Sequence, residues 1–143
     1  MSKITYHRLF GIAGLILVLD QITKVLIQHS IPFETSYYAP DRITIIENFF
    51  YLVHIGNEGA AWGMFSEYSE ILSLLAFVVL LFIYLFRKHL EFNRNSIQIA
   101  FGLLIGGILG NLIDRLRVGH VIDFIDIHLP FNLPYILPYG RWP

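Results

Sequence analysis

Three long apolar runs constrain the fold of this chain more than any other feature of its sequence. They cover residues 9–27, 71–86 and 97–113. A helix needs about 20 mostly apolar residues to cross the roughly 30 Å hydrocarbon core of a bilayer. The runs are close to that length, so we predict three transmembrane helices.

The composition agrees with a lipid environment and excludes several classes of function. Apolar residues make up 55% of the chain and charged residues only 15%, where about 25% charged residues is usual in soluble domains. The formal net charge of −1 argues against a nucleic-acid partner, which usually leaves a basic footprint. The chain has no cysteine, which excludes disulfides, cysteine nucleophiles and cysteine metal ligands.

Residues 30–69 differ from the apolar runs and predict short strands. The segments 43–46 and 49–55 are β-prone, and proline and glycine punctuate the surrounding sequence. This pattern favours strands between residues 43 and 65. Aromatic residues crowd the same region, and such rings favour the headgroup boundary. We therefore expect a small sheet on the membrane surface.

The distribution of lysine and arginine predicts the orientation. Lys3 and Arg8 precede the first run, and Arg87, Lys88 and Arg94 lie between the second and third, whereas residues 30–69 contain only Arg42. Positive loops stay on the cytoplasmic side, so we place the N-terminus there. Residues 1–143 are then a single integral membrane domain, an all-α bundle with a small extracytoplasmic β-sheet. We expect residues 114–143 to form a loop on the outer face.

The third run contains glycines at four-residue spacing, at positions 102, 106 and 110. Glycine faces let membrane helices approach closely. We interpret Gly102, Gly106 and Gly110 as a packing stripe against another helix.

Two charged residues lie inside the first run. Asp20 and Lys24 are four residues apart on one helix face, a spacing at which an acid and a base can form an ion pair. Charges inside a membrane are expensive and therefore suggest function. A structural ion pair and a role facing the substrate remain equally open, and the two are compatible.

A second group of polar residues follows the third run. Asn111 and Asp114 are three residues apart and share a helix face in this prediction, and Asp123 and Asp126 follow among apolar residues. Two carboxylates at the membrane boundary can share a proton and activate water for peptide hydrolysis, one as base and one as acid. The residue pattern alone leaves open which acids form such a pair, although we expect Asp126 to be a solvated loop acid.

Other chemistries have weaker support. The chain has no G-x-S-x-G nucleophile motif and no H-E-x-x-H zinc motif. A metal site could use His120, Asp123, Asp126 and His128, but their spacing matches no site that we can justify. This metal site is a minor alternative, and we expect no metal.

Three motifs together resemble a known family, the lipoprotein signal peptidases (signal peptidase II). Residues 19–24 (LDQITK) resemble the family pattern L-D-Q-x-[ST]-K, and residues 57–62 (NEGAAW) resemble N-x-G-A-[AS]-[FW]. Residues 107–115 (GILGNLIDR) and 119–124 (GHVIDF) are similar to G-x-x-G-N-x-x-D-R and G-x-V-x-D-F. The motifs occur in the family's order over nearly the whole chain.

The resemblance implies an aspartyl peptidase of the bacterial cytoplasmic membrane. It would cut prolipoprotein signal peptides just before the diacylglyceryl-modified cysteine, with membrane lipid as surroundings and no cofactor. Asp123 matches the first aspartate of the family's catalytic dyad. The positions that match residues binding substrate or supporting the site are Asp20, Lys24, Asn57, Gly59, Asn111, Asp114 and Arg115.

The sequence departs from the family at its C-terminal end. The family continues beyond a W-P pair into F-N-x-A-D, which carries the second dyad aspartate, and then into a fourth span. This sequence ends at Trp142-Pro143. We therefore expect a C-terminally truncated chain that is inactive by itself. The alternative function is a non-catalytic small membrane protein that binds lipidated chains or serves as a transport subunit.

Overall fold

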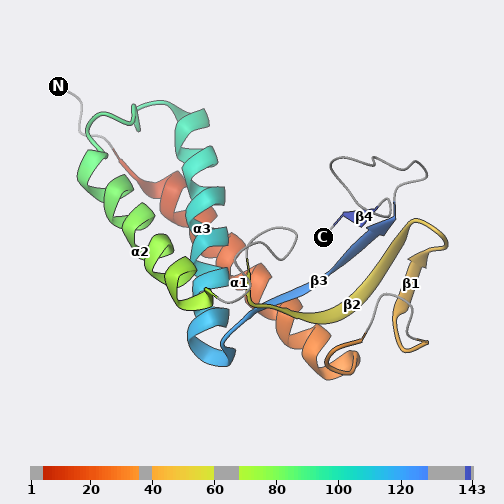
Figure 1. The fold of residues 1–143 in the computed structure, drawn as a ribbon. Coiled ribbons are helices and arrows are strands. Elements are labelled where there is room, and N and C mark those ends of the chain that lie inside the picture. Colours follow the sequence, from red (N-terminus) through yellow and green to blue (C-terminus); the bar gives the residue numbers. More distant parts are fainter. Residues whose placement is uncertain (1–4, 36–39, 60–67, 129–140, 143) are drawn as a thin grey trace. The chain divides into compact units, whose positions relative to one another are not determined.

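The computed structural model describes residues 5–35, 40–59, 68–128 and 141–142 (Figure 1). Within these ranges the chain forms three α-helices and a four-stranded sheet. It divides into two compact units. The first comprises residues 1–23 and 70–119, and the second comprises residues 24–69 and 120–143.

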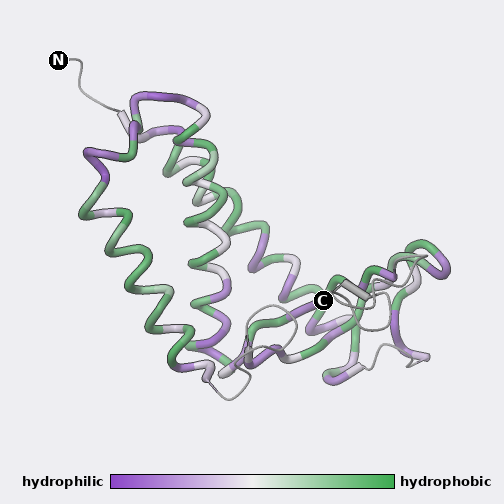
Figure 2. Tube along the Cα trace, turned by 45° about the horizontal axis from the view of Figure 1, so that its top comes forward, coloured by the Kyte–Doolittle hydropathy of each residue, from purple (hydrophilic) through white to green (hydrophobic). Residues whose placement is uncertain are grey.

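The helices are α1 (His7–Ser30), α2 (Ser69–Phe86) and α3 (Asn95–Val118). All three are long and apolar enough to cross a membrane, which confirms the prediction of three such helices. Each contains one of the apolar runs and extends beyond it at one or both ends. Figure 2 shows α2 hydrophobic along almost its whole length, and most of its side chains are exposed in the structure. Such a surface is stable only in contact with lipid or protein.

The first unit is held together by close packing of α3 on α1. A Cβ atom built on Gly106 would lie 2.7 Å from Ile16 Cβ and 2.9 Å from the Ala13 carbonyl oxygen. A Cβ atom on Gly102 would lie 2.9 Å from Ile12 Cβ. No side chain fits in these spaces, so the two backbones are in contact through the glycines. This confirms the predicted packing stripe.

A buried glutamine joins the segments at one end of the first unit. The Gln98 amide nitrogen donates to the Phe92 carbonyl oxygen at 2.7 Å and to the Thr5 carbonyl oxygen at 2.9 Å. The Leu9 backbone N–H donates to the Gln98 side-chain oxygen at 3.3 Å. Because an unsatisfied polar group is costly in an apolar interior, these bonds fix the loop before α3 against the start of α1.

The second unit contains an antiparallel sheet with strand order β1-β2-β3-β4. The strands are β1 (Ile43–Ile46), β2 (Phe50–Asn57), β3 (Val121–His128) and β4 (Arg141–Trp142). The first two lie in the segment predicted as strands, although residues 60–65 of that segment lie outside the described residues. Residues 114–143 had been expected to form a loop. Instead α3 continues to Val118, and β3 and β4 extend the sheet.

A β-bulge interrupts the pairing of β2 with β3. The strands are in register on both sides of it, through the pairs Leu52–Ile125 and Ile55–Asp123. Between these pairs β2 has one residue more than β3, so Val53 and His54 together lie opposite Phe124. Both bulge residues are buried. A bulge of this kind bends its strand and shifts the pairing by one residue.

The connection from α3 to β3 is short. Gly119 ends the helix with φ of 85°, and its N–H donates to the Arg115 carbonyl oxygen at 3.0 Å. This left-handed cap is the usual place for glycine, because a Cβ atom disfavours positive φ. Only His120 then separates the cap from the first residue of β3.

Candidate active site

The predicted site residues of the second unit meet at Asp123. The Asn57 amide nitrogen donates to Asp123 Oδ2 at 2.7 Å. The amide oxygen of Asn57 accepts from the Gly59 N–H at 2.8 Å. One asparagine therefore holds the carboxylate and the turn that follows β2. Ala60, Ala61 and Trp62 of the same motif lie outside the described residues.

The bulge explains why Asn57 reaches Asp123. Asn57 pairs with Val121, two residues from Asp123 along β3, so both side chains lie on the same face of the sheet. If the register before the bulge continued unchanged, Asn57 would pair with His120. Its side chain would then lie on the opposite face, because a slip of one residue inverts a strand.

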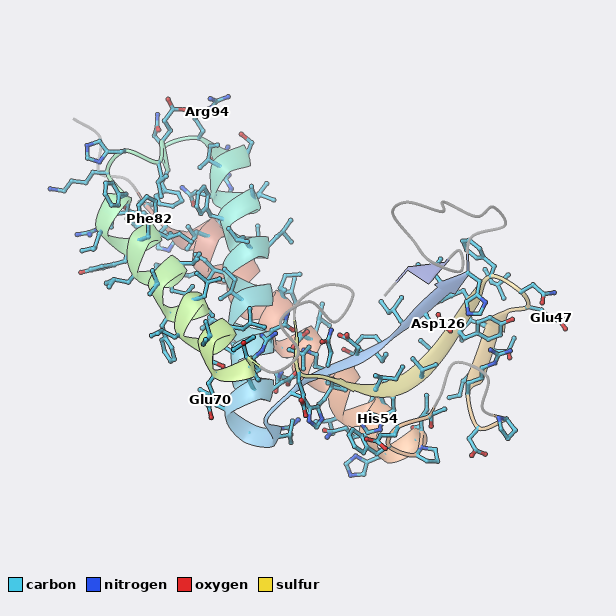
Figure 3. All side chains as sticks on the ribbon, in the orientation of Figure 1. Glu47, His54, Glu70, Phe82, Arg94 and Asp126 are labelled. Carbon is cyan, nitrogen blue, oxygen red and sulfur yellow. The ribbon has the colours of Figure 1, made fainter. Side chains whose placement is uncertain are left out.

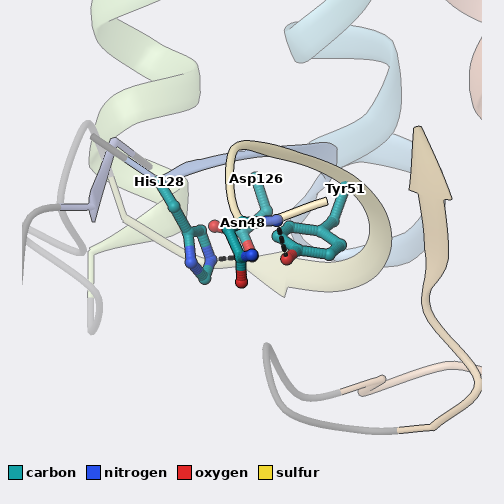
Figure 4. A network of polar contacts seen from close by, with 4 residues as sticks. All are labelled: Asn48, Tyr51, Asp126 and His128. Atoms are coloured by element: carbon teal, nitrogen blue, oxygen red, sulfur yellow. Dashed lines mark hydrogen bonds and ion pairs between the residues drawn. The ribbon is translucent and has the colours of Figure 1, made fainter. Parts of the chain in front are cut away.

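Asp126 lies on the same strand but in a different environment. It is three residues from Asp123, so its side chain is on the other face of β3. It is fully buried, and the His128 ring nitrogen Nε2 lies 2.8 Å from its Oδ2 (Figure 4). The expectation of a solvated loop acid was wrong. Alternating apolar residues around Asp126 place it in a strand, and the opposite residue Tyr51 helps to cover it.

Tyr51 connects this buried acid to the β1–β2 hairpin. Its hydroxyl accepts from the Asn48 backbone N–H at 2.6 Å (Figure 4), and its ring contacts the His128 ring at a centroid distance of 5.0 Å. The Arg42 guanidinium lies 3.8 Å from the centroid of the Tyr51 ring. These contacts give Asp126 and His128 a structural role, separate from Asn57 and Asp123.

The four residues considered as metal ligands do not form a metal site. Strand alternation separates Asp123 from Asp126, and the His120 ring stacks on Phe33 at a centroid distance of 5.3 Å. Within the described ranges no three His, Cys, Asp or Glu side chains are arranged to hold a metal ion. The geometry gives no support to the metal alternative.

The first unit contains a second polar cluster, centred on Gln21. The Gln21 amide nitrogen lies 3.0 Å from Asp20 Oδ2, 3.1 Å from Asp114 Oδ1 and 3.4 Å from the Gly110 carbonyl oxygen. Asp114 is fully buried. A Cβ atom on Gly110 would overlap Asp20 Oδ2. Gly110 therefore leaves room for the Asp20 carboxyl group, which shares the Gln21 amide with Asp114.

Gln21 was not predicted to be a site residue, although it lies inside the first motif. An amide has two N–H donors, so Gln21 can satisfy both acids at once. Polar groups at membrane depth need such partners, because lipid offers none. The signal that could have identified it is the presence of an amide beside Asp20 within an otherwise apolar run.

The remaining predicted residues have individual positions. Lys24 is 2% exposed on α1, and its ion pair with Asp20 stays a prediction. Asn111 and Asp114 both lie on α3 at the predicted three-residue spacing, but Asn111 is exposed whereas Asp114 is buried. Arg115 is half-buried in the last turns of α3, where its carbonyl oxygen accepts a hydrogen bond from the Gly119 N–H.

Comparison with known proteins covers nearly the whole chain. Residues 12–142 match the family model described as signal peptidase (SPase) II. The lipoprotein signal peptidase of Moorella thermoacetica is 33% identical over 124 residues, covering 85% of this chain and 79% of that protein. The lipoprotein signal peptidase of Thermodesulfovibrio yellowstonii is 40% identical over 116 residues, covering 80% of this chain and 71% of that protein.

Solved structures show the same relationship in three dimensions. One bacterial membrane enzyme aligns with a TM-score of 0.73 and 31% identity, covering 93% of this chain and 76% of that one. Another aligns with a TM-score of 0.67 and 29% identity, covering 93% and 80%. The residues that match the family model, 12–142, include the motifs around Asp20, Asn57 and Asp123. The chain therefore belongs to the signal peptidase II family of aspartyl endopeptidases.

Proposed function

We propose that this protein removes signal peptides from prolipoproteins, with Asp123 as one of two catalytic carboxylates. The observation that carries the assignment of Asp123 is its 2.7 Å hydrogen bond from Asn57, formed by two residues of different family motifs. They are 66 positions apart in the sequence. The side-chain amide orients the Asp123 carboxylate through a neutral hydrogen-bond donor and places no positive charge beside it.

Asp123 acts as the general base in this proposal. Its carboxylate accepts a proton from water, and the resulting hydroxide attacks the carbonyl carbon of the scissile peptide bond. The second carboxylic acid of the dyad protonates the departing amine as the carbon–nitrogen bond breaks. A correctly placed general base contributes on the order of 10²–10⁴ in rate. Asp126 does not serve as the partner, because it lies on the opposite face and interacts with His128.

The substrate is proposed to be a signal peptide that precedes a diacylglyceryl-modified cysteine. Three helices suited to crossing a membrane would let such a substrate keep its acyl chains in lipid during cleavage. We place the protein in the bacterial cytoplasmic membrane as a multi-pass protein with a cytoplasmic N-terminus. The support is the lysine and arginine of the N-terminal flank and of residues 87–94.

The polar cluster of the first unit supports the site in this proposal. Asp20 and Asp114 share the Gln21 amide, and charged groups at membrane depth are retained mainly where function needs them. We assign Lys24, Asn111 and Arg115 to the same supporting role or to contact with substrate. Gly59 supports the site through its backbone N–H, which holds the Asn57 amide.

The test is a cleavage assay on the protein expressed from its complete reading frame and purified in lipid. The substrates are a prolipoprotein peptide with the diacylglyceryl-cysteine and the same peptide with an unmodified cysteine. We expect mass spectrometry to show cleavage directly before the modified cysteine, unchanged by a metal chelator and absent in Asp123→Asn. Cleavage by Asp123→Asn, or cleavage that the chelator stops, would contradict the proposal.

The non-catalytic alternative predicts a different outcome of the same assay. A binder of lipidated chains would retain the modified peptide without cutting it. The family match and the named relatives favour the peptidase, so we expect product rather than a stable complex.

A further inference from the structure

We propose that His54 is a positioning residue, which holds the β-bulge that places Asn57 against Asp123. This inference rests on the proposed function of Asp123 and adds a residue outside the family motifs discussed above. His54 is labelled in Figure 3, on the strand β2 that leads to Asn57.

The first observation is that His54 is anchored from outside the sheet. It is 4% exposed, and its Nδ1 lies 3.0 Å from the Ile31 carbonyl oxygen. A carbonyl oxygen only accepts, so Nδ1 carries the proton and donates it. The Phe33 ring meets the His54 ring edge to face at a centroid distance of 5.2 Å. The segment after α1 thus holds the bulge residue by one hydrogen bond and one ring contact.

The second observation is what the bulge does to the strand. The extra residue lies between Leu52 and Ile55, three positions before Asn57. A bulge disrupts the hydrogen-bond ladder, so it persists only where other contacts stabilise it. If the His54 anchor is lost, β2 can continue in its earlier register, and Asn57 then turns away from Asp123.

The third observation connects the anchor to the start of β3. Phe33 also stacks on the His120 ring, with 25° between the ring planes. That ring covers Gly56, where a Cβ atom would lie 2.9 Å from His120 Cδ2. Phe33 therefore contacts both the bulge residue of β2 and the residue that precedes β3. The two strands are fixed by the same ring on the approach to Asn57 and Asp123.

His54 could anchor the bulge by its hydrogen bond, or it could only fill space in the interior. Two variants distinguish these two roles. In His54→Asn the amide nitrogen can donate to the Ile31 carbonyl oxygen in place of Nδ1. In His54→Leu the volume is similar but the donor is lost. We expect His54→Asn to keep kcat within about threefold. His54→Leu should lower kcat about 10–100-fold, because the slipped register removes the hydrogen bond from Asn57 to the Asp123 carboxylate. KM should change little in both, because the buried His54 side chain is not accessible to a substrate.

Cysteine cross-linking measures the register of β2 against β3 directly, and it does not depend on enzymatic activity. The chain has no cysteine, so an introduced pair reports its own spacing to a short thiol cross-linker. The pair Ile55→Cys with Asp123→Cys lies after the bulge, and the control pair Leu52→Cys with Ile125→Cys lies before it. In the His54 and His54→Asn backgrounds we expect both pairs to cross-link. In His54→Leu only the control pair should do so.

Each other outcome overturns the inference. Full cross-linking of the 55–123 pair in His54→Leu would show that the bulge needs no anchor, whatever the activity. Loss of both pairs in His54→Leu would show that His54 holds the whole sheet rather than the bulge. Normal kcat in His54→Leu would show that the register is irrelevant to the reaction. The cross-linking result stands even if no variant cleaves prolipoprotein, which separates this inference from the proposed function.

Discussion

The first unit, which contains the helix contact (the helical unit), and the second unit, which contains the sheet (the sheet unit), position their polar side chains by different physical means. In the helical unit, Asp20 and Asp114 share the Gln21 amide because α3 packs directly on α1 through glycines. In the sheet unit, Asn57 and Asp123 meet because two strands pair in one particular register. Helices can separate by fractions of an ångström, whereas a strand slips by whole residues. We therefore expect graded defects in the first unit and all-or-none defects in the second.

The largest effect should come from Asp123→Asn. The amide keeps the shape of the side chain but cannot accept a proton from water, so cleavage should fall by about 10²–10⁴ or more. Thermal unfolding should be nearly unchanged, because the side chain is only partly buried. A cleavage rate within tenfold of that of the unmodified protein would show that Asp123 is not the general base. The comparison between the two units would then no longer concern catalysis.

Asn57→Ala tests the second half of the same contact. It removes the 2.7 Å bond to Asp123 Oδ2 and leaves the backbone pairing with Val121 in place. A hydrogen bond to a charged group contributes about 1.5–3 kcal/mol, so kcat should fall roughly 10–100-fold. Asn57→Asp is a control that keeps the size of the side chain. Its kcat should be at least as low as that of Asn57→Ala, because two carboxyl groups would then face each other. Equal rates for all three proteins would mean that the bond does not orient the base.

Gly106→Leu tests the helical unit, with Gly107→Leu as the matched control. A side chain at 106 would meet Ile16 and the Ala13 carbonyl oxygen, whereas a Cβ atom at 107 has nothing within 4 Å among the described residues. Overpacking of this kind costs about 1–3 kcal/mol. We expect a lower unfolding temperature for the first variant and little change for the second, measured in the same detergent. Equal temperatures would mean that the glycine contact does not hold the helices together.

The smallest effect should come from Asp126→Asn. The amide can still bond to His128 but loses the charge that strengthens this contact, a loss of about 1 kcal/mol. Stability should fall slightly, and kcat should remain within about threefold. If Asp126→Asn abolished cleavage while Asp123→Asn did not, the two acids would have exchanged roles and the assignment of faces on β3 would be wrong.

The sequence predicted those features that depend on local patterns. Run length located the three helices, and four-residue spacing located the contact face of α3. The β-prone segment 43–46 coincides with β1. Motif order led to the family, because each motif fixes residue types at positions that packing alone would leave variable.

The sequence did not predict those features that depend on a partner strand or helix. Residues 121–128 carry two aspartates among apolar residues, and their pattern does not show which acid faces solvent until β2 is opposite. The bulge at His54 exists only relative to β3, so no pattern within β2 reveals it. Gln21 joins Asp20 to Asp114 only after α1 and α3 have packed.

The glycine at position 110 has a consequence for genetics that the other stripe glycines do not share. At 102 and 106 an added methyl group meets Cβ atoms and backbone oxygens of α1, but at 110 its three nearest atoms all belong to the carboxyl group of Asp20. A carboxylate can rotate away, whereas a backbone cannot. Alanine alleles at 102 and 106 should therefore be temperature-sensitive for prolipoprotein cleavage. An alanine allele at 110 should be equally impaired at every temperature, because it displaces the Asp20 carboxyl group and leaves the helices together.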